Sequence, residues 1–188
     1  MDEREIFSLP SNLPVPKDDG LCNHLVGMCL PNVRLPCTSG AKISLRSVNP
    51  KFIVVYCFPL AWVTGTELPP NWDEIPGARG CTPQSCAFRD RSKEIESFGG
   101  SIFGISTQTK EDQLELFHRL HLPFDLLSDN ELQFASAMGL PTFQVAGMTL
   151  IRRVTLIAAD AVVRKVFYPV FPPDRNAEQV LAWLRSKE

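Results

Sequence analysis

The fold of this chain is decided by residues 52–58, which read FIVVYCF. The run is continuously apolar and rich in β-branched and aromatic side chains. It has the length of a central parallel strand that is covered on both faces of a sheet. Pro59 ends the run, because proline cannot continue the strand's hydrogen-bonded ladder. We therefore expect an α/β protein built outward from this strand.

The segments that follow the strand alternate between helical and strand patterns. Expected elements are a helix from about Cys81 to the glycines 99–100, a strand at 101–105, a helix capped by Thr109 with Asp112, and a short helix from 128 or 129 to Gly139, then strands at 153–158 and 162–167, and a last helix with Asn176 and Gln179 as its capping box. This order, βαβα followed by ββα, is typical of a thioredoxin-like fold with a central mixed sheet and helices on both faces.

The residues before the strand predict an N-terminal extension. Residues 1–24 are polar and interrupted by prolines, so we expect an extended, partly mobile arm. Residues 27–45 contain a turn, at 37–40, and a short alternation, which predict a hairpin near the edge of the sheet. We expect one thioredoxin-like domain over residues 25–188. Residues 60–79, rich in Pro, Gly and Trp, form an unusually long connection of the kind that tends to be functional.

Composition narrows the class of protein. The chain has 188 residues, a formal net charge of −2 and interspersed charges, so a broad basic surface for nucleic acid is not expected. The first residues lack the pattern of a signal peptide, and no stretch approaches the ~20 apolar residues of a membrane span. We expect a cytoplasmic protein, with no membrane partner, that is a monomer or a weak homodimer. In that setting its six cysteines favour burial or redox chemistry over structural disulfides.

Residues 80–90, GCTPQSCAFRD, place two cysteines at the start of a helix. Pro83 fits the first helical position and Thr82 the cap before it, so the helix begins at about Cys81. The unpaired N–H groups and the positive end of the helix dipole favour a thiolate there. The helix follows a central strand at its carboxyl end, where ligands collect in open α/β sheets. Cys81 is thus the candidate nucleophile.

Several motifs together resemble the peroxiredoxin family, in its bacterioferritin comigratory protein or peroxiredoxin Q type. The likeness extends from about Gly27 to Trp183. It is carried by Gly27-Met28-x-Leu30-Pro31, Val54-Val55-Tyr56-x-Phe58-Pro59, Gly80-Cys81-Thr82-x-x-x-Cys86-x-Phe88-Arg89-Asp90, Pro123-Phe124-x-Leu126-Leu127-Ser128-Asp129 and Arg153-x-Thr155-Leu156.

The resemblance implies a thiol peroxidase without cofactor or metal. It makes Cys81 the peroxidatic cysteine, which a peroxide oxidises to a sulfenic acid, and Cys86 the cysteine that resolves it as an intramolecular disulfide. It places Arg153 over the sulfur and implies recycling by thioredoxin or a similar dithiol. The chemistry fits these residue types, because a guanidinium favours a thiolate and stabilises charge on the leaving oxygen.

The spacing of the two cysteines adds a prediction. Residues five apart in an ideal helix differ by roughly 140° in direction and about 7.5 Å in rise, which exceeds the reach of a disulfide. We therefore expect the first turn or more of this helix to unwind when Cys81 and Cys86 are joined.

One position departs from the family's pattern. The family's active-site loop usually runs Pro-x-x-x-Thr/Ser-x-x-Cys, whereas this chain has Glu74 and Ala78 at the Pro and Thr/Ser positions. Either Thr64, Thr66 or a backbone group replaces the missing hydroxyl, or the enzyme works without it. Arg79 is a candidate second cation beside Cys81.

Two other functions remain open. One is a non-enzymatic thiol sensor or partner-binding module that uses the Cys81–Cys86 disulfide as a switch. The other is a dithiol-disulfide oxidoreductase, which is disfavoured because the spacing is not Cys-x-x-Cys.

The remaining cysteines, histidines and tryptophans have structural interpretations. We expect Cys57 to be a buried apolar residue. Cys22, Cys29 and Cys37 fit no zinc motif. His118 and His121 are expected on a solvated helix face. Trp62 and Trp72 read as packing within the insertion, or as a wall over the peroxide site.

Overall fold

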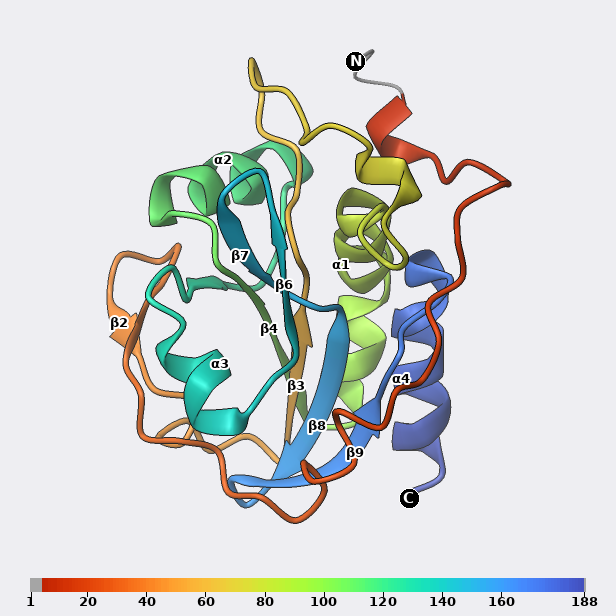
Figure 1. The fold of residues 1–188 in the computed structure, drawn as a ribbon. Helices are drawn as coiled ribbons and strands as arrows, with labels where there is room; N and C mark the ends of the chain where they lie inside the picture. The colour runs from red at the N-terminus through yellow and green to blue at the C-terminus, as the bar shows by residue number, and fades with distance from the viewer. Residues whose placement is uncertain (1–4, 188) are drawn as a thin grey trace.

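The protein is described by a computed structural model over residues 5–187. Its centre is a five-stranded mixed sheet in the order β5-β4-β3-β8-β9 (Figure 1). The strands of this sheet are β3 (Phe52–Cys57), β4 (Gly100–Ser106), β5 (Leu126–Ser128), β8 (Val154–Ala159) and β9 (Val162–Phe167). The helices are α1 (Cys81–Ser97), α2 (Lys110–Leu120), α3 (Gln133–Met138) and α4 (Asn176–Arg185), and the 3-10 turns are η1 (Glu5–Phe7), η2 (Trp72–Glu74) and η3 (Pro173–Arg175).

Strand β3 is the middle of the sheet, as its sequence predicts. All six of its residues are buried. It runs parallel to β4, with Val54 opposite Ile102, and antiparallel to β8, with Val55 opposite Leu156. The continuous apolar run follows from this position, because both faces of the strand are covered.

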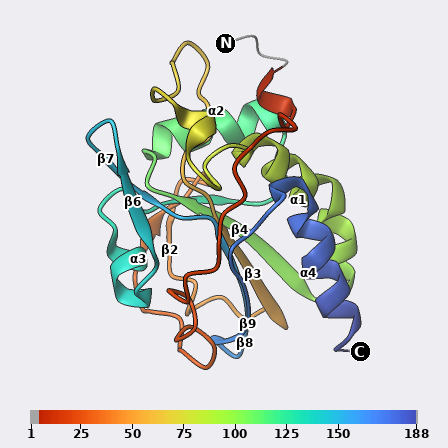
Figure 2. The same cartoon turned by 45° about the vertical axis from the view of Figure 1, so that its right-hand side comes forward.

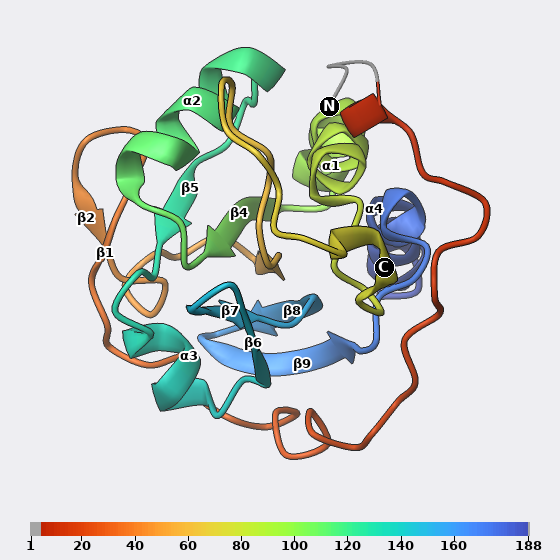
Figure 3. The same ribbon diagram turned by 45° about the horizontal axis from the view of Figure 1, so that its top comes forward.

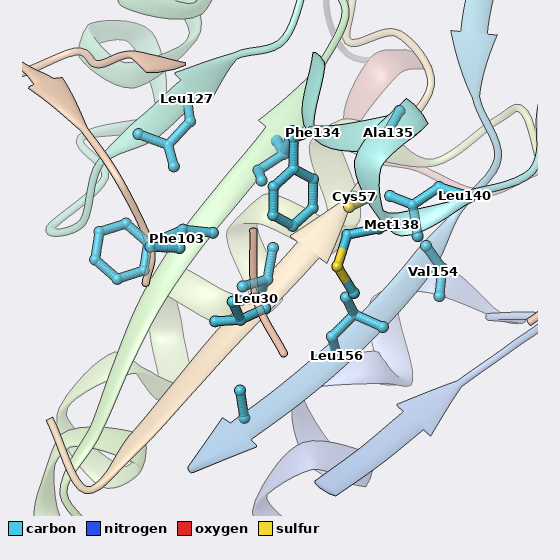
Figure 4. Close-up of a cluster of buried hydrophobic side chains, with 14 of the residues drawn as sticks. Leu30, Cys57, Phe103, Leu127, Phe134, Ala135, Met138, Leu140, Val154 and Leu156 are labelled. Atoms are coloured by element: carbon cyan, nitrogen blue, oxygen red, sulfur yellow. The ribbon is translucent and has the colours of Figure 1, made fainter. Parts of the chain in front are cut away.

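Helices cover both faces of the sheet, which confirms the thioredoxin-like expectation. Helices α1, α2 and α4 lie on one face, and α3 lies on the other with the loops that precede β3 (Figure 3). Alternate side chains of β3 enter the two cores: Val54 and Tyr56 face α1, while Val55 and Cys57 face α3. Figure 4 shows Cys57 among Phe134, Met138 and other apolar side chains, and burial raises the pKa of its thiol far above the ordinary range.

Two small hairpins stand outside the main sheet. The expected N-terminal hairpin is present as β1 (Leu35–Pro36) and β2 (Lys42–Ile43). It lies beside edge strand β5, where the Thr38 N–H donates to the Leu126 carbonyl at 3.1 Å. The second hairpin, β6 (Thr142–Val145) and β7 (Met148–Ile151), is not predicted from the sequence. Each strand is only four residues long, so the alternation of β6 (TFQV) is too short to mark a strand.

The start of α3 differs from the prediction. The helix begins at Gln133 rather than at 128 or 129, because Leu132 adopts a left-handed backbone with φ 56°. The Asp129 carboxylate accepts the N–H groups of Phe134 (3.0 Å) and Ala135 (2.8 Å). Asp129 therefore caps the helix from several residues away, and Ser128 belongs to β5.

The N-terminal arm lies against the domain. Between its turns, residues 13–19 form neither helix nor strand. The arm is held at both ends: Ile6 in η1 is only 4% exposed, and Asp19 accepts from Tyr168 (3.0 Å) and pairs with Arg152 (3.2 Å). Figures 1 and 2 show η1 beside η2 and the first turn of α1. Its partial mobility and the division at residues 24 and 25 stay predictions.

Within residues 5–187, no helix has both the length and the apolar character needed to cross a bilayer.

Candidate active site

Cys81 is the first residue of α1. It follows position 80, which only glycine can occupy. Gly80 is the N-cap, with φ 103° and no side-chain cap, so the predicted capping role of Thr82 is wrong. A Cβ at Gly80 would lie 2.4 Å from Pro173 Cγ and 2.8 Å from Leu9 Cδ2. This close packing holds the sulfur at the end of the helix where the N–H groups are unpaired and the dipole is positive.

Arg153 contacts the sulfur directly, at the position that the resemblance implies. Its Nη2 lies 3.1 Å from Cys81 Sγ, and the residue is 4% exposed. The same nitrogen donates to the carbonyls of Ala78 (2.9 Å) and Arg79 (3.2 Å), and Nε donates to that of Gly77 (3.2 Å). The guanidinium therefore fastens the loop before α1 and supplies a charge-assisted donor to a thiolate.

A buried polar chain orients Arg153 from the side away from the sulfur. Gln84 Oε1 accepts from Arg153 Nη1, and Gln84 Nε2 donates to Asn176 Oδ1 at 2.9 Å. The Thr155 hydroxyl donates to the same Asn176 oxygen at 2.6 Å, and all three partners are fully buried. Because the acceptor at Arg153 is a neutral amide, it fixes the guanidinium without neutralising its charge.

The sequence does not predict this series of buried hydrogen bonds, and it predicts the wrong role for Asn176. The structure makes Asn176 the first residue of α4 and gives the helix no side-chain cap, so the predicted capping box is wrong. The amide is committed to Gln84 and Thr155 instead, although its Nδ2 lies 3.4 Å from Gln179 Oε1. A partial signal was present, because Gln84 stands three residues after Cys81 and so lies on the same face of the helix.

The sulfur's surroundings show what occupies the place of the missing hydroxyl. Thr64 donates to Glu115, and Thr66 donates to the carbonyl of Val63, and both threonines are exposed. At Ala78 the backbone carbonyl is 3.6 Å from Cys81 Sγ and accepts from its thiol. A carbonyl holds the thiol form and donates nothing to a thiolate. Within residues 5–187, the group that donates a hydrogen bond to the Cys81 sulfur is therefore the Arg153 guanidinium.

Cys81 faces a small cavity that is partly open to solvent. The residue is 3% exposed, and the cavity measures about 10 Å³. Its lining comes from the N-terminal arm, the 60–79 insertion and the start of α1, namely Ile6, Leu60, Trp62, Leu68, Trp72, Arg79, Gly80, Cys81 and Thr82. Trp62 and Trp72 thus serve both as packing in the insertion and as walls of the site.

Arg79 is a second cation on this cavity. It is 7% exposed, and its Nη1 forms an ion pair with Asp73 Oδ1 at 3.2 Å. The insertion therefore balances part of its charge. That Arg79 acts as a second cation for Cys81 stays a prediction.

Cys86 lies on the same helix, half-buried, and is not disulfide-bonded. Burial raises the pKa of its thiol, with Arg89 opposing that rise and Asp90 adding to it. The intact helix therefore keeps Cys86 protonated and unreactive at neutral pH. Unwinding of the helix would return it to water and to an ordinary thiol's reactivity.

A pH profile tests this. In the Cys81→Ser variant, we expect alkylation of Cys86 by iodoacetamide to be slow at pH 7. A raised pKa moves the thiolate to higher pH, so the rate should climb at pH values above the ordinary thiol value of about 8.5. Peptide mass spectrometry gives the rate, with exposed Cys29 in the same sample as the comparison. Equal rates for both cysteines at pH 7 would contradict it.

The other candidate side chains are spread through the fold. Cys22 and Cys37 are buried, and burial raises the pKa of both, for Cys22 to about 12. His118 and His121 are exposed. In the part of the chain that the structure describes, no group of three or more His, Cys, Asp or Glu side chains could hold a metal ion.

Comparison with known proteins gives one consistent result. Residues 25–181 match the Redoxin family. The chain is 29% identical to a chloroplastic peroxiredoxin Q of Sedum lineare over 180 residues, covering 96% of this chain and 88% of that protein. It is 27% identical to its counterpart in Populus jackii over 185 residues, covering 96% and 79%.

Solved structures agree in fold. The peroxidoxin BcpB of Mycobacterium tuberculosis superposes with a TM-score of 0.70 at 25% identity, covering 87% of this chain and 97% of that one. A peroxiredoxin Q of Xanthomonas campestris superposes with a TM-score of 0.65 at 18% identity, covering 94% and 98%. The second likeness bears on the fold alone.

Proposed function

The chain belongs to the Redoxin family, as a peroxiredoxin of the bacterioferritin comigratory protein or peroxiredoxin Q type, and on this premise we propose that Cys81 is its peroxide-reducing thiolate. The family makes the protein a thiol peroxidase. The observation that carries the assignment to Cys81 is the 3.1 Å contact between its sulfur and Arg153 Nη2, at the first residue of a helix.

The first step is a two-electron oxidation of the sulfur. The Cys81 thiolate attacks one peroxide oxygen, a new S–O bond forms, and the O–O bond breaks. The leaving oxygen takes a proton and departs as water, or as an alcohol if the substrate is an organic hydroperoxide. Arg153 holds the thiolate and stabilises the negative charge on the leaving oxygen, and it cannot lose its own proton. The sulfur is left as a sulfenic acid.

The second step uses Cys86. Its thiol condenses with the sulfenic acid to form a disulfide and release water. Thioredoxin or a similar dithiol then reduces this disulfide by exchange and is itself oxidised. The position of Cys86 five residues after Cys81 on the same helix supports this pairing, since a local rearrangement is enough to bring it to Cys81.

The disulfide requires α1 to open at its start. We expect oxidation to remove hydrogen-exchange protection from the amides of residues 84–87, because two sulfurs five residues apart on a helix cannot bond. Protection should persist beyond Phe88, which is fully buried and stacks on Tyr56 with ring centroids 4.6 Å apart.

Hydrogen exchange followed by mass spectrometry measures this opening. The matched control is Cys86→Ser treated with the same peroxide, which forms no Cys81–Cys86 disulfide and should stay protected. If the disulfide-linked chain keeps full protection at the amides of 84–87, the unwinding is ruled out.

A thiol sensor is the second candidate, and the small volume of the cavity beside Cys81 favours it. A thioredoxin-coupled steady-state assay, with hydrogen peroxide and an organic hydroperoxide side by side, separates the two. Repeated rapid turnover supports the peroxidase. Oxidation followed by slow recycling supports the sensor.

The cellular location and the oligomeric state are predicted from the sequence alone. A cytoplasmic location stays a prediction, since the named relatives are chloroplast proteins. A monomer or weak homodimer is likewise our expectation, which size-exclusion chromatography checks.

A further inference from the structure

The wall of the Cys81 cavity includes a side chain from the N-terminal arm. Ile6, in η1, is 4% exposed and lines the cavity together with Cys81. We propose that Ile6 determines substrate size, by limiting the Cys81 site to hydrogen peroxide and the smallest hydroperoxides. This inference rests on the proposed role of Cys81 as the peroxide-reducing thiolate.

The size of the cavity sets the limit. A volume of about 10 Å³ is close to the least space that holds one water molecule. Hydrogen peroxide has only two heavy atoms, so a small movement of the walls admits it. A hydroperoxide with a phenyl or branched alkyl group brings several more carbon atoms, and this volume does not hold them beside the sulfur unless a wall residue moves or is shortened.

The other large walls are held firmly. Trp72 packs with Ala78 and Leu150 in a buried cluster of the insertion. The Trp62 indole N–H donates to the Thr66 carbonyl at 2.9 Å, and the Arg119 guanidinium lies 5.3 Å from the ring centroid. Movement of either tryptophan would break these contacts.

Ile6 lies outside both of these sets of contacts. It belongs to a three-residue 3-10 turn on an arm that contributes no strand to the main sheet. The turn lies over the start of α1 (Figures 1 and 3), and Leu9 beyond it packs against the backbone of Gly80. Ile6 is therefore the wall whose change alters the cavity with the least effect on the fold.

The neighbouring residue supplies a matched control. Phe7 is 49% exposed and is absent from the cavity lining, although it shares the turn with Ile6. Phe7→Ala thus removes an apolar side chain from the same turn without opening the site. Ile6→Val gives an intermediate step, and thermal unfolding checks that all variants are folded.

The experiment compares the rates at which hydrogen peroxide and cumene hydroperoxide oxidise Cys81. We expect Ile6→Ala to raise the ratio of the cumene hydroperoxide rate to the hydrogen peroxide rate by about tenfold or more, the scale on which pockets discriminate by a few carbon atoms. Ile6→Val should raise it less, and Phe7→Ala should leave it unchanged. If Ile6→Ala and Phe7→Ala give the wild-type ratio, Ile6 does not set substrate size.

A second readout does not depend on peroxidase chemistry. Alkylation of Cys81 is followed by peptide mass spectrometry, with iodoacetamide as the small reagent and N-phenylmaleimide as the bulky one. Ile6→Ala should accelerate the bulky reagent far more than the small one. If that pattern appears while no variant reduces peroxide, Ile6 does gate the sulfur by size and the proposed function fails. If peroxide is reduced but neither size pattern changes, the gate fails and the function stands.

Discussion

Replacing Cys81 with serine is expected to abolish peroxide turnover, leaving only the uncatalysed rate. Serine keeps the size of the side chain, but its hydroxyl is neutral at pH 7 and cannot act as the nucleophile that a thiolate is. The loss should be complete rather than partial, because each later step uses the sulfenic acid that Cys81 forms. The thioredoxin-coupled assay measures it.

Two further serine variants make this result specific. Cys29→Ser changes an exposed cysteine outside the site and should turn over at the wild-type rate. Cys86→Ser should consume one peroxide per chain and then stall with thioredoxin, since the sulfenic acid has no partner thiol on the same helix. Full activity in Cys81→Ser would falsify the assignment of the nucleophile.

Replacing Arg153 with glutamine is expected to slow oxidation of Cys81 by about 10²–10³, the scale of losing one preorganised donor at the reacting atoms. The variant loses a cation 3.1 Å from the sulfur and the donors to three loop carbonyls, those of Gly77, Ala78 and Arg79. The attacking sulfur and the leaving oxygen then both lose the donor that orients and stabilises them.

A lysine variant separates the charge of Arg153 from its geometry. Arg153→Lys should fall between wild type and Arg153→Gln, because it keeps the charge but lacks the fork that reaches the sulfur and the carbonyls together.

Arg152→Gln is the matched control for this change. The adjacent Arg152 is half-exposed and pairs with Asp19 of the arm rather than with Cys81 or the loop before α1. We expect its oxidation rate to stay near that of wild type. Stopped-flow oxidation by hydrogen peroxide gives the rates, and thermal unfolding shows whether unpaired buried carbonyls destabilise Arg153→Gln. A wild-type rate in that variant would remove Arg153 from the mechanism.

Elements with strong local signals follow from the sequence. Strand β3 is read from its continuous apolar run, and α2 from the reciprocal hydrogen bonds of Thr109 and Asp112 at its start. The β8–β9 hairpin is also predicted, although its turn, Asp160 and Ala161, takes positive φ values without a glycine. Each of these elements is specified mainly by its own residues.

Elements that depend on distant partners do not follow from the sequence. The late start of α3 depends on the Asp129 carboxylate, and β5 has only three residues, paired to β4. Asn176 carries the local pattern of a cap, but its amide bonds to Gln84, 92 residues away. Tertiary contacts outweigh local preference in each case.

The candidate site divides in the same way. Cys81 and Arg153 are predicted from motifs, and the structure brings them into contact across 72 residues of chain. The residues that confine the site were harder to foresee. Ile6 lies in a polar arm with no periodicity, so its place over Cys81 comes only from how the arm packs.

The most direct test of Cys81 as the reactive thiolate is peptide mass spectrometry of the full chain after one equivalent of hydrogen peroxide. The predicted result is one peptide that carries an internal disulfide between Cys81 and Cys86. Cys22, Cys29, Cys37 and Cys57 should still be reduced. Oxidation at exposed Cys29 while Cys81 and Cys86 stay reduced would contradict it.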